Sequence, residues 1–479
     1  MAQGTYQKRE GPGSRSPAVE VPDHVFREYD VRGVVGRDLS DAFVYSLGRA
    51  IGTLYRREGV TVAALGCDAR LSSPAFKEAM AAGLTDCGVH VIDIGLVPTP
   101  VLYFSLFHLD VAGGVMITGS HNPPDENGFK VCLGKTTIYG EAIQEVKAIM
   151  VRHDFAAGTG TRRSLSVNEG YVRTIANSLG CGGGARRRVK AVVDAGNGTG
   201  NTVALDLYRS LGHDVTGIYS EPDGRFPNHH PDPTVPDNLK ALVEEVKRTG
   251  AELGIAFDGD ADRIGVVAAD GTILWGDQLL ILFARDILST RPGEKIIGEV
   301  KCSEALFDEV RKAGGVPIMW KVGHSLIKAK LKEEGALLAG EMSGHLFFAD
   351  TYYGFDDAVY AGARLLDLLS RSSRTLADLV GTLPKRYNTP EVRMDCPENV
   401  KRVVVDCVAK AFERMYEVDR IDGARIRFPQ GWGLVRASNT QPAVVLRFEA
   451  ESPEALEEIK TAVSREVRAA LELGLVQGN

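Results

Sequence analysis

One rhythm of alternating strands and helices occurs three times along the chain, and it constrains the fold more than any single motif does. In each unit an apolar strand-like run, a helical pattern and a second strand-like run follow one another, at 62–95, 189–219 and 294–323. A further apolar run that ends in a polar loop follows each unit, at 113–122, 252–263 and 335–345. Such repeats with Val- and Ile-rich strands predict α/β domains with largely parallel pairing.

The last hundred residues break this rhythm. The stretch 424–452 has the pattern of three strands separated by a turn and a loop. A helical pattern follows, because apolar residues recur at helical spacing at Leu456, Ile459, Val463, Val467 and Leu471. Ser452 and Pro453 form a suitable N-cap and first-turn pair for that helix. We therefore predict a separate α+β domain at this end.

The length of 479 residues is too great for one hydrophobic core. The predicted fold class is therefore α/β, with three similar mixed-sheet α/β domains plus a C-terminal α+β domain. The N-terminal stretch is polar and rich in Gly and Pro, which predicts a disordered tail. The predicted ranges are 1–22 for this tail and 23–167, 168–272, 273–384 and 385–479 for the four domains.

Composition excludes several functional classes. The chain has 56 basic and 63 acidic residues, a net charge of −7, which argues against broad nucleic-acid binding. No run approaches the roughly 18 apolar residues of a membrane span, and no apolar signal core is found. The seven cysteines are scattered without a C-x-x-C pair, so neither a zinc ribbon nor a disulfide framework is indicated. We predict a cytoplasmic protein.

The stretch 115–131, VMITGSHNPPDENGFKV, raises the question of whether Ser120 carries chemistry. It is no hydrolase nucleophile elbow, because Thr118 and Asn122 stand where G-x-S-x-G requires glycine. A purely structural interpretation is that Thr, Ser, His and Asn supply turn hydrogen bonds and that two prolines end the strand. The loop by itself leaves both interpretations open.

Three aspartates alternate at 258, 260 and 262, directly after an apolar run. Carboxylates so close repel one another unless a cation neutralises them, and they are ligands suited to Mg²⁺ or Ca²⁺. An EF-hand is excluded, since Arg263 and Ala269 stand where it needs Gly and Glu. Mg²⁺ often combines a few carboxylates with a phosphate oxygen, so a phosphate on Ser120 would complete the site. This favours Ser120 as a phosphoryl carrier.

Two further loops carry polar groups suited to a phosphorylated sugar. The motif at 340–345, GEMSGH, could bind sugar hydroxyls and move protons, or could be a polar turn. The motif at 436–442, RASNTQP, joins an arginine to short polar side chains, which is typical of a phosphate cradle but also of a hairpin loop. Isolated cations such as Arg32 and Lys301 would each be ordinary surface charges.

Together the motifs TGSHNPPDENGFK, DGDADR, GEMSGH and RASNT, in this order, resemble the four signature loops of the α-D-phosphohexomutase superfamily. The bacterial phosphomannomutase/phosphoglucomutase group is the most similar. The resemblance extends from FREYDVRG at 26–33 almost to the C-terminus. It implies four domains around a central cleft and an enzyme phosphoserine at Ser120. The last domain, as the odd fold that carries the phosphate loop, is expected to close this cleft.

The resemblance also implies roles for individual residues. The expected catalytic residues are Ser120, Lys130, Arg32, Arg263 and His345, with Lys130 and His345 as candidates for proton transfer. The expected Mg²⁺ ligands are Asp258, Asp260, Asp262 and Ser120 through its phosphate. The expected substrate-binding residues are Tyr29, Lys301, His324, Glu341, Met342, Ser343, Gly344, His345, Arg436, Ala437, Ser438, Asn439 and Thr440. Ala261 departs from the glycine often found in the aspartate loop, which puts only the loop shape in doubt.

The implied activity is reversible interconversion of hexose 1-phosphate and hexose 6-phosphate, with mannose and/or glucose as the sugar. It would proceed through the phosphoserine and a bound hexose 1,6-bisphosphate, with Mg²⁺ and glucose 1,6-bisphosphate as cofactors. The expected partner is a small-molecule phosphosugar, and neither nucleic acid nor membrane. The alternatives are a phosphoglucosamine mutase, a phosphatase that passes the phosphate to water, and a non-catalytic sugar-bisphosphate sensor.

Overall fold

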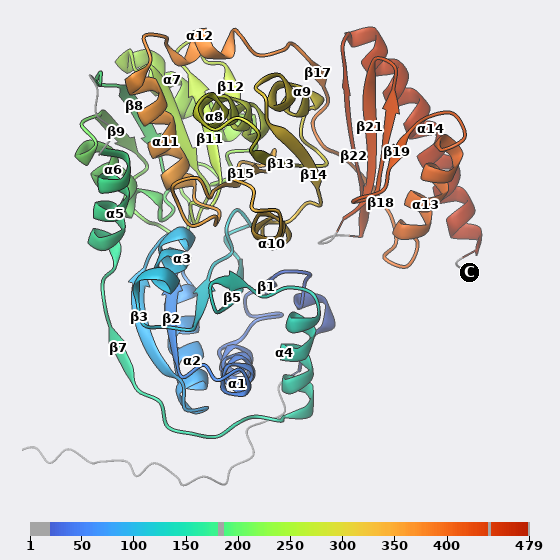
Figure 1. The fold of residues 1–479 in the computed structure, drawn as a ribbon. Coiled ribbons are helices and arrows are strands. Elements are labelled where there is room, and N and C mark those ends of the chain that lie inside the picture. Colours follow the sequence, from blue (N-terminus) through green and yellow to red (C-terminus); the bar gives the residue numbers. More distant parts are fainter. Residues whose placement is uncertain (1–19, 181–185, 439–441, 478–479) are drawn as a thin grey trace, which may run out of the picture.

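Four β-sheets follow one another along the chain, and each has its own helices (Figure 1). This computed structural model describes residues 20–180, 186–438 and 442–477. Most of the predicted N-terminal tail, 1–19, lies outside the described residues. The described part begins with a short 3₁₀ turn, η1 (Asp23–Val25).

The first sheet has the strand order β1-β5-β4-β2-β3-β7, with β6 paired to β5. Its parallel centre consists of β2, β3 and β4, and β5 runs antiparallel to β4. One face packs against α1, α2 and α4, and α3 covers the other. The strands are β1 (Val31–Val34), β2 (Val62–Cys67), β3 (His90–Leu96), β4 (Gly113–Ile117), β5 (Glu126–Leu133), β6 (Thr136–Thr137) and β7 (Arg162–Ser164). The helices are α1 (Asp41–Arg57), α2 (Ser73–Thr85), α3 (Thr99–His108) and α4 (Glu141–Arg152).

The second and third sheets have the orders β12-β11-β10-β8-β9 and β14-β13-β15-β16. The second contains β8 (Lys190–Asp194), β9 (Asp214–Ile218), β10 (Leu253–Phe257), β11 (Ile264–Ala268) and β12 (Ile273–Leu274), with α5 (Asn168–Gly180), η2 (Gly200–Thr202), α6 (Ala204–Ser210), η3 (Pro236–Leu239) and α7 (Lys240–Thr249). The third contains β13 (Lys295–Glu299), β14 (Val316–Trp320), β15 (Leu338–Gly340) and β16 (Leu346–Phe348), with α8 (Gly276–Thr290), α9 (Glu304–Lys312), α10 (His324–Glu334), α11 (Ala358–Arg371) and α12 (Leu376–Val380).

The first three sheets share one arrangement, as the repeated rhythm predicts. In each, the first strand of the repeat lies between the second and third in parallel, and a fourth strand runs antiparallel to the third. The loop between the third and fourth strands is therefore equivalent in all three domains. These loops are 118–125, 258–263 and 341–345, which are the polar motifs of the sequence.

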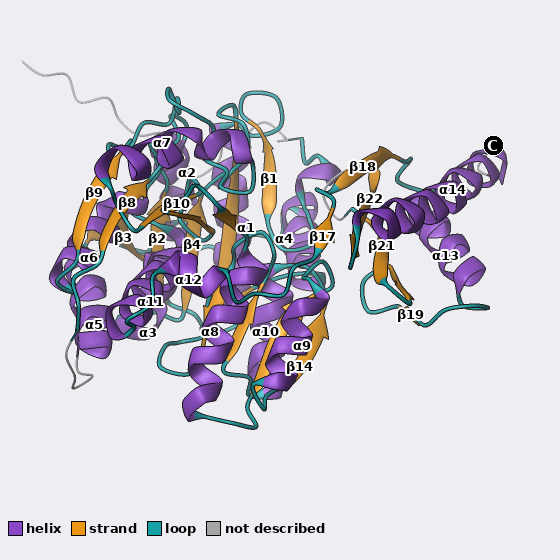
Figure 2. Cartoon of the chain, turned by 90° about the horizontal axis from the view of Figure 1, so that it is seen from above, coloured by secondary structure: helices purple, strands orange, loops and turns teal. Residues whose placement is uncertain are grey.

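The C-terminal domain is a six-stranded antiparallel sheet with helices on one face (Figure 2). Its apolar core lies between the sheet and two helices, α13 and α14. The predicted N-cap of α14 is present, since the Ser452 hydroxyl accepts a hydrogen bond from the Ala455 amide at 3.1 Å. The elements are β17 (Tyr387–Asn388), β18 (Val392–Asp395), α13 (Lys401–Phe412), β19 (Val418–Asp419), β20 (Ala424–Phe428), β21 (Gly431–Ala437), β22 (Ala443–Ala450) and α14 (Pro453–Gln477). The predicted fold class, three similar α/β domains and one α+β domain, is confirmed.

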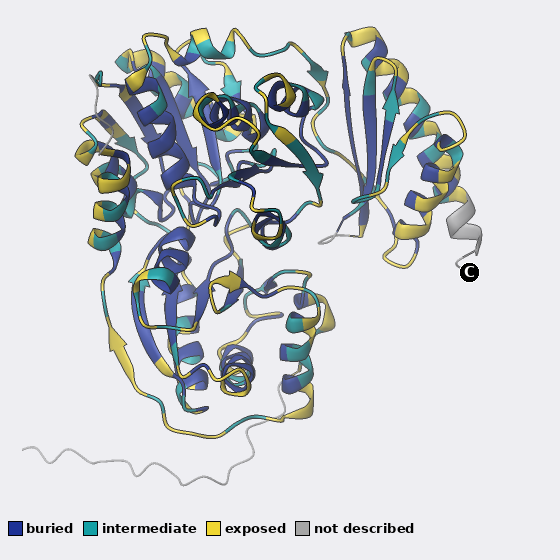
Figure 3. Ribbon diagram, in the orientation of Figure 1, coloured by how far each residue is buried: buried dark blue, intermediate teal, exposed yellow. Residues whose placement is uncertain are grey.

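The packing of the domains is uneven. One large apolar core runs through the first three domains, joining α3, α6, α8 and α11, and the fourth domain has a core of its own (Figure 3). The fourth domain meets the third through a small cluster around Val300, Trp432 and Leu434.

β12 belongs to the second sheet although it follows the predicted limit at 272. Within the described residues no helix is both long and apolar enough to cross a membrane.

Candidate active site

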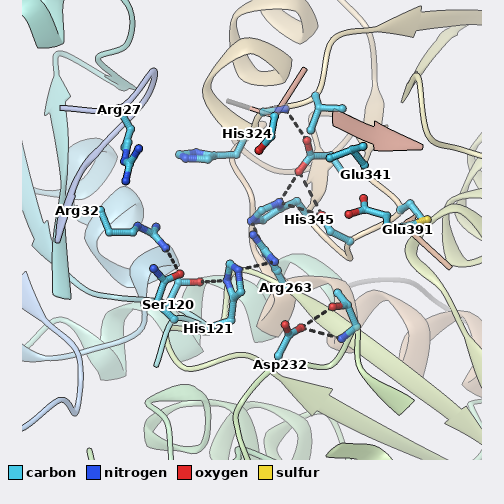
Figure 4. Close-up of a pocket in the computed structure, with 18 of the residues that line it drawn as sticks. Arg27, Arg32, Ser120, His121, Asp232, Arg263, His324, Glu341, His345 and Glu391 are labelled. Atoms are coloured by element: carbon cyan, nitrogen blue, oxygen red, sulfur yellow. Dashed lines mark hydrogen bonds and ion pairs between the residues drawn. The ribbon is translucent and has the colours of Figure 1, made fainter. Parts of the chain in front are cut away.

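The three equivalent loops converge on one cleft with the inner face of the fourth domain. The cleft has a volume of about 1010 Å³. Ser120, Arg263 and His345, one from each of the first three domains, line it, and so does Arg436 from the fourth domain. Figure 4 shows the side chains of these loops pointing toward one another.

Ser120 lies in the first loop, between β4 and β5, and is almost completely buried. Its backbone has a φ of 48°, the left-handed region that a non-glycine residue rarely adopts. The amide of Ser120 donates to the Thr118 hydroxyl at 2.8 Å. The Ser120 hydroxyl donates to Asp258 Oδ2 at 2.5 Å and lies 3.1 Å from His121 Nδ1. The strained turn therefore directs this hydroxyl across the domain boundary at the aspartate loop.

The three aspartates of the second loop form a buried carboxylate cluster. Oxygen atoms of Asp258, Asp260 and Asp262 lie within 4.8 Å of one another. Burial and the two neighbouring carboxylates raise the pKa of Asp258 well above its usual range. The buried Oδ1 of Asp260 has no hydrogen-bond partner. An unpaired carboxylate oxygen in such a cluster fits a hard divalent cation, so these residues suit the predicted metal.

Ala261, which replaces the glycine often found in the aspartate loop, adopts a glycine-like backbone conformation. It has a φ of 57°, a backbone conformation that favours glycine, and its side chain is fully buried. The loop thus keeps the glycine-like turn with an alanine in it. The carbonyl of Ala261 accepts from the Ala358 amide at 3.3 Å, which ties the loop to the start of α11.

Cationic groups surround Ser120 and the aspartates. Lys130 Nζ on β5 lies 2.8 Å from Asp260 Oδ2 and also contacts Asp262. Burial acts to lower the pKa of Lys130, but these carboxylates raise it above the usual range, so the ammonium stays charged. Arg32 on β1 donates to the Asn122 side chain at 2.6 Å and pairs with Asp30 at 2.7 Å. Arg263 Nη1 lies 3.4 Å from His121 Nε2.

The third loop is built around His345 and Glu341. His345 Nδ1 lies 2.5 Å from Glu341 Oε2, and its Nε2 lies 3.2 Å from Asp262 Oδ1. Although burial opposes it, Asp262 and Glu341 raise the pKa of His345 to about 9. The other oxygen of Glu341 accepts from the Gly323 amide at 2.7 Å. The imidazolium thus links the sugar loop of the third domain to the aspartate loop of the second.

Cations from the third and fourth domains also line the cleft. Arg436 on β21 pairs with Asp422 at 3.0 Å, and Lys301 pairs with Glu391 at 2.8 Å. Lys301 follows β13 of the third domain, so this pair joins the third domain to the fourth. Cations of this kind are suited to binding a phosphate.

Of the other predicted residues, those described are mostly at the cleft. The ring of Tyr29 lies 5.3 Å from that of His324. Both of these residues line the cleft, as do Met342, Ser343 and Ser438. Gly344, Ala437, Asp258 and Asp260 are not among the described lining residues, although Asp258 contacts the Ser120 hydroxyl. Asn439 and Thr440 lie outside the described residues.

Sequence reasoning missed several groups of the cleft. His121 beside Ser120 was interpreted only as a turn residue, although it contacts the reacting hydroxyl. Glu391 at the cleft, and Asp422 behind Arg436, lie outside the recognised motifs and meet Lys301 and Arg436 only through the tertiary fold. The one signal in the sequence was a titratable side chain directly after the motif serine, and it pointed to His121 alone.

Family models match the four domains in order. Domains I, II and III of phosphoglucomutase/phosphomannomutase, described as alpha/beta/alpha, match 23–157, 169–271 and 275–387, and the C-terminal domain matches 391–466. The fold and the site define an α/β phosphohexomutase. The chain belongs to the phosphoglucomutase/phosphomannomutase family, which makes it an enzyme of the isomerase class, as predicted.

Individual relatives are similar over nearly the whole chain. A phosphomannomutase/phosphoglucomutase of Pseudomonas aeruginosa is 45% identical over 95% of this chain and 98% of its own length. A phosphoglucomutase of Neisseria gonorrhoeae is 47% identical over 91% of this chain and 95% of its own. A crystal structure of a phosphoglucomutase/phosphomannomutase family protein from Burkholderia thailandensis has a TM-score of 0.89, with 44% identity, and covers 94% of this chain and 98% of that one.

Proposed function

We propose that the chain reversibly converts hexose 1-phosphates into hexose 6-phosphates, acting on both mannose and glucose phosphates. The observation that carries the proposal is the shared cleft, which Ser120 lines together with the cations Arg436 and Lys301. A sugar with two phosphates could span this cleft. The names of the bacterial relatives include both phosphomannomutase and phosphoglucomutase, which supports the two sugars.

In this proposal Ser120 carries the phosphoryl group that is exchanged. Phosphoserine donates to the free hydroxyl of a hexose monophosphate, which forms a bound 1,6-bisphosphate, glucose 1,6-bisphosphate for the glucose substrate. After the bisphosphate has turned over in the cleft, its other phosphate returns to Ser120. Transfer of this kind depends chiefly on position and neutralised charge, for which Arg32, Lys130 and Arg263 are suited.

Asp258, Asp260 and Asp262 would hold Mg²⁺ together with an oxygen of the Ser120 phosphate. Bound there, the ion would neutralise charge on the phosphoryl group. The buried, unpaired oxygen of Asp260 supports this assignment. In the structure Lys130 pairs with two of these carboxylates, and it would still lie beside the phosphoryl group when they bind the metal.

Protons must leave the attacking sugar hydroxyl and reach the serine oxygen. Lys130 and His345 are the groups proposed for these transfers, since each lies next to the aspartate loop. Glu341 holds His345 in position by contacting the Nδ1 atom of its imidazole. Together with Ser343, Glu341 would also bind sugar hydroxyls. Met342 and Gly344 would shape the same loop around the sugar.

The non-reacting phosphate would bind to the cradle of the fourth domain. Arg436 and Ser438 support it from the described residues, and Ala437, Asn439 and Thr440 belong to the same loop. Lys301, His324 and Tyr29 would assist from the facing domains. Because the two phosphates exchange places, this cradle must accept either one. The predicted domain limits are 23–167, 168–272, 273–384 and 385–479, of which the limit at 272 moves past β12 because that strand belongs to the second sheet.

We also propose that the protein works in the cytoplasm. The six described cysteines, of which five are buried, are all free thiols. Free thiols are typical of a reducing compartment. The small-molecule phosphosugar would be its partner.

³¹P NMR of the purified protein tests the proposed activity. Mannose 1-phosphate and glucose 1-phosphate are supplied in separate tubes with Mg²⁺ and catalytic glucose 1,6-bisphosphate. We expect 6-phosphate signals in both tubes, and the two initial rates would rank the sugars. A tube without protein is the control for spontaneous conversion.

The other outcomes distinguish the alternatives. Release of inorganic phosphate without 6-phosphate would favour a phosphatase. Persistence of both 1-phosphates, while mass spectrometry shows Ser120 phosphorylated, would favour a phosphoglucosamine mutase or a sugar-bisphosphate sensor. Conversion of glucosamine 1-phosphate in a third tube would then separate these two.

A further inference from the structure

A buried arginine behind the catalytic cleft holds the backbone of the phosphoserine loop, which here means the loop 118–125 together with Glu126, the first residue of β5. Arg70 follows β2, and its side chain is 0% exposed. Its Nη2 donates to the carbonyl oxygens of Ser120 at 2.9 Å and Asn122 at 2.6 Å. Its Nη1 donates to the carbonyl of Glu126 at 2.7 Å and also to that of Pro123. One guanidinium therefore binds four carbonyls of this short loop.

Asp68 completes the clamp from the same polar turn after β2. Its Oδ2 lies 3.3 Å from Arg70 Nε and accepts from the Gly119 amide at 3.1 Å. Its Oδ1 accepts from the Arg70 amide at 3.0 Å and from the Ser73 hydroxyl at 2.6 Å. Asp68 therefore binds an N–H group of the phosphoserine loop while Arg70 binds its carbonyls.

The loop backbone lies directly against the guanidinium. A Cβ atom added at Gly119 would overlap Cζ and Nε of Arg70. Glycine is required here because any side chain would push the loop off the clamp.

The second domain encloses the clamp from outside. The Phe226 ring lies 5.4 Å from Arg70 Cζ, and a Cβ at Gly224 would collide with the backbone of Ala69 and Arg70. In the same region His230 Nε2 contacts the carbonyl of His121, the loop carbonyl between those of Ser120 and Asn122. Arg70 thus has little freedom to move while the first two domains stay packed together.

This arrangement has an electrostatic consequence at Ser120. Carbonyl oxygens carry partial negative charge and would repel a phosphoryl group attached to the serine. Arg70 donates to four of them and offsets their partial charge in a buried setting, where such interactions are strong. The same hydrogen bonds hold Ser120 in its left-handed conformation, with its hydroxyl toward Asp258.

We propose that Arg70 is a positioning residue for phosphoryl transfer, which holds the phosphoserine loop in its reactive conformation without touching the substrate. This inference rests on the proposed function of Ser120. Arg70 is absent from the described residues that line the cleft. Its effect should therefore fall on turnover and on the phosphoserine itself, and much less on the binding of the phosphosugar.

The test compares Arg70→Lys with Arg364→Lys in the full-length protein. Lysine keeps the positive charge but cannot reach four carbonyls at once. Arg364 on α11 is a matched control, because it is also buried and pairs with Asp350 at 2.8 Å, away from Ser120. Each variant is assayed for kcat and KM with glucose 1-phosphate, and for the half-life of its phosphoserine by intact mass spectrometry. Melting temperatures show whether both variants are folded.

We expect Arg70→Lys to lower kcat at least tenfold and to shorten the phosphoserine half-life at least threefold, with KM changed less than threefold. Arg364→Lys should keep all three values. A folded Arg70→Lys protein with kcat within twofold of wild type and an unchanged half-life would overturn the inference, as would a rise in KM alone.

If Arg70→Lys does not fold, Gly119→Ala displaces the loop with Arg70 intact, and the same criteria apply. An inactive wild-type protein would refute the proposed function, and the half-lives would still test Arg70.

Discussion

At the scale of single residues, Ser120 is the group on which the proposed chemistry depends. It is buried, its backbone is left-handed, and its hydroxyl contacts Asp258, one of the three aspartates proposed to bind the metal. Such strain in a non-glycine residue is tolerated only where the surrounding structure enforces it. The loop contacts of Arg70, Asp68 and Thr118 provide that enforcement.

Replacement of Ser120 by alanine should remove the phosphoryl carrier. We expect turnover of glucose 1-phosphate to fall at least about a thousandfold, since loss of a covalent nucleophile is rarely compensated. Incubation with glucose 1,6-bisphosphate should add one phosphate, about 80 Da, to the wild-type mass and none to the variant. Ser210→Ala, at an exposed position on α6, is the control. Substantial phosphorylation of the Ser120→Ala protein would contradict the assignment.

Replacement of Asp260 by asparagine should weaken binding of a divalent cation. The change removes one of three clustered carboxylates, so we expect the Kd for Mg²⁺, measured by titration calorimetry, to rise at least about tenfold. Asp93→Asn is the control, because Asp93 is also buried and ion-paired but lies outside the cluster. Equal Mg²⁺ affinity in wild-type and Asp260→Asn proteins would show that the aspartates are not the metal site.

Ala261 allows a prediction about backbone strain. Glycine there would remove the strain of the left-handed conformation, which costs alanine about 1–2 kcal/mol. Against this, glycine would lose a buried methyl group that stabilises the fold by about 0.8 kcal/mol, and it would raise the entropy of the unfolded chain. We therefore expect Ala261→Gly to change the free energy of unfolding by less than about 1 kcal/mol. Ala261→Val should destabilise by more than about 2 kcal/mol, because a β-branched residue is poorly tolerated at a φ of 57°. Urea denaturation of both variants measures their free energies of unfolding. Similar midpoints for Ala261→Gly and Ala261→Val would contradict the prediction.

At the scale of secondary-structure elements, the start of α11 joins the second and third domains. Asp357 caps this helix by accepting from the Tyr360 amide at 2.8 Å. It also accepts from the hydroxyls of Tyr171 on α5 and Tyr352, each at 2.9 Å. Burial nevertheless raises the pKa of Asp357 to about 7. A helix cap is thus also a titrating group inside a domain interface.

The raised pKa of Asp357 predicts how stability depends on pH. Between its ordinary value near 4 and about 7, the folded state binds more protons than the unfolded state, so this contribution to stability is lost as the pH rises through that interval. Asp357→Asn keeps an N-cap oxygen but does not titrate. We expect its denaturation midpoint to fall less than that of wild type between pH 5 and pH 8. Burial raises the pKa of Glu299 to about 7 as well, so some slope should remain. Parallel curves for the two proteins would contradict the prediction.

At the scale of the whole molecule, three domains share one core and the fourth has its own. The fourth meets the third at Arg425, which donates to the carbonyl of Val300 at 2.9 Å and pairs with Glu304 at 2.9 Å. Arg436 and Lys301, the cations proposed to bind phosphate, lie in the same two domains. Because the fourth domain has its own core and meets the third through few contacts, we predict that it can move relative to the other three domains.

Binding of a bisphosphate should bring the fourth domain closer to the other three. Two phosphates held at opposite walls would draw these walls together and exclude water from the reaction. We expect the radius of gyration from small-angle X-ray scattering to decrease when glucose 1,6-bisphosphate is added. Inorganic phosphate at the same concentration is the control, because it cannot bridge the cleft. An unchanged radius with saturating bisphosphate would contradict closure.

The sequence by itself determined the local structures and the chemistry that they carry. Periodicity and turn residues depend on neighbours in the chain, so the three repeats, the odd last domain and the polar loops around Ser120, Asp258 and Glu341 could all be predicted. Only the tertiary structure decided which distant groups meet. Three examples are the hydrogen bonds from Arg70 to four loop carbonyls, the ion pair of Glu391 with Lys301, and the burial that raises the pKa of Asp357 to about 7. Each of them depends on the packing of segments that are distant in the sequence. Burial and cross-domain distance, which set those contacts, are properties of the folded molecule and leave no local pattern in the chain.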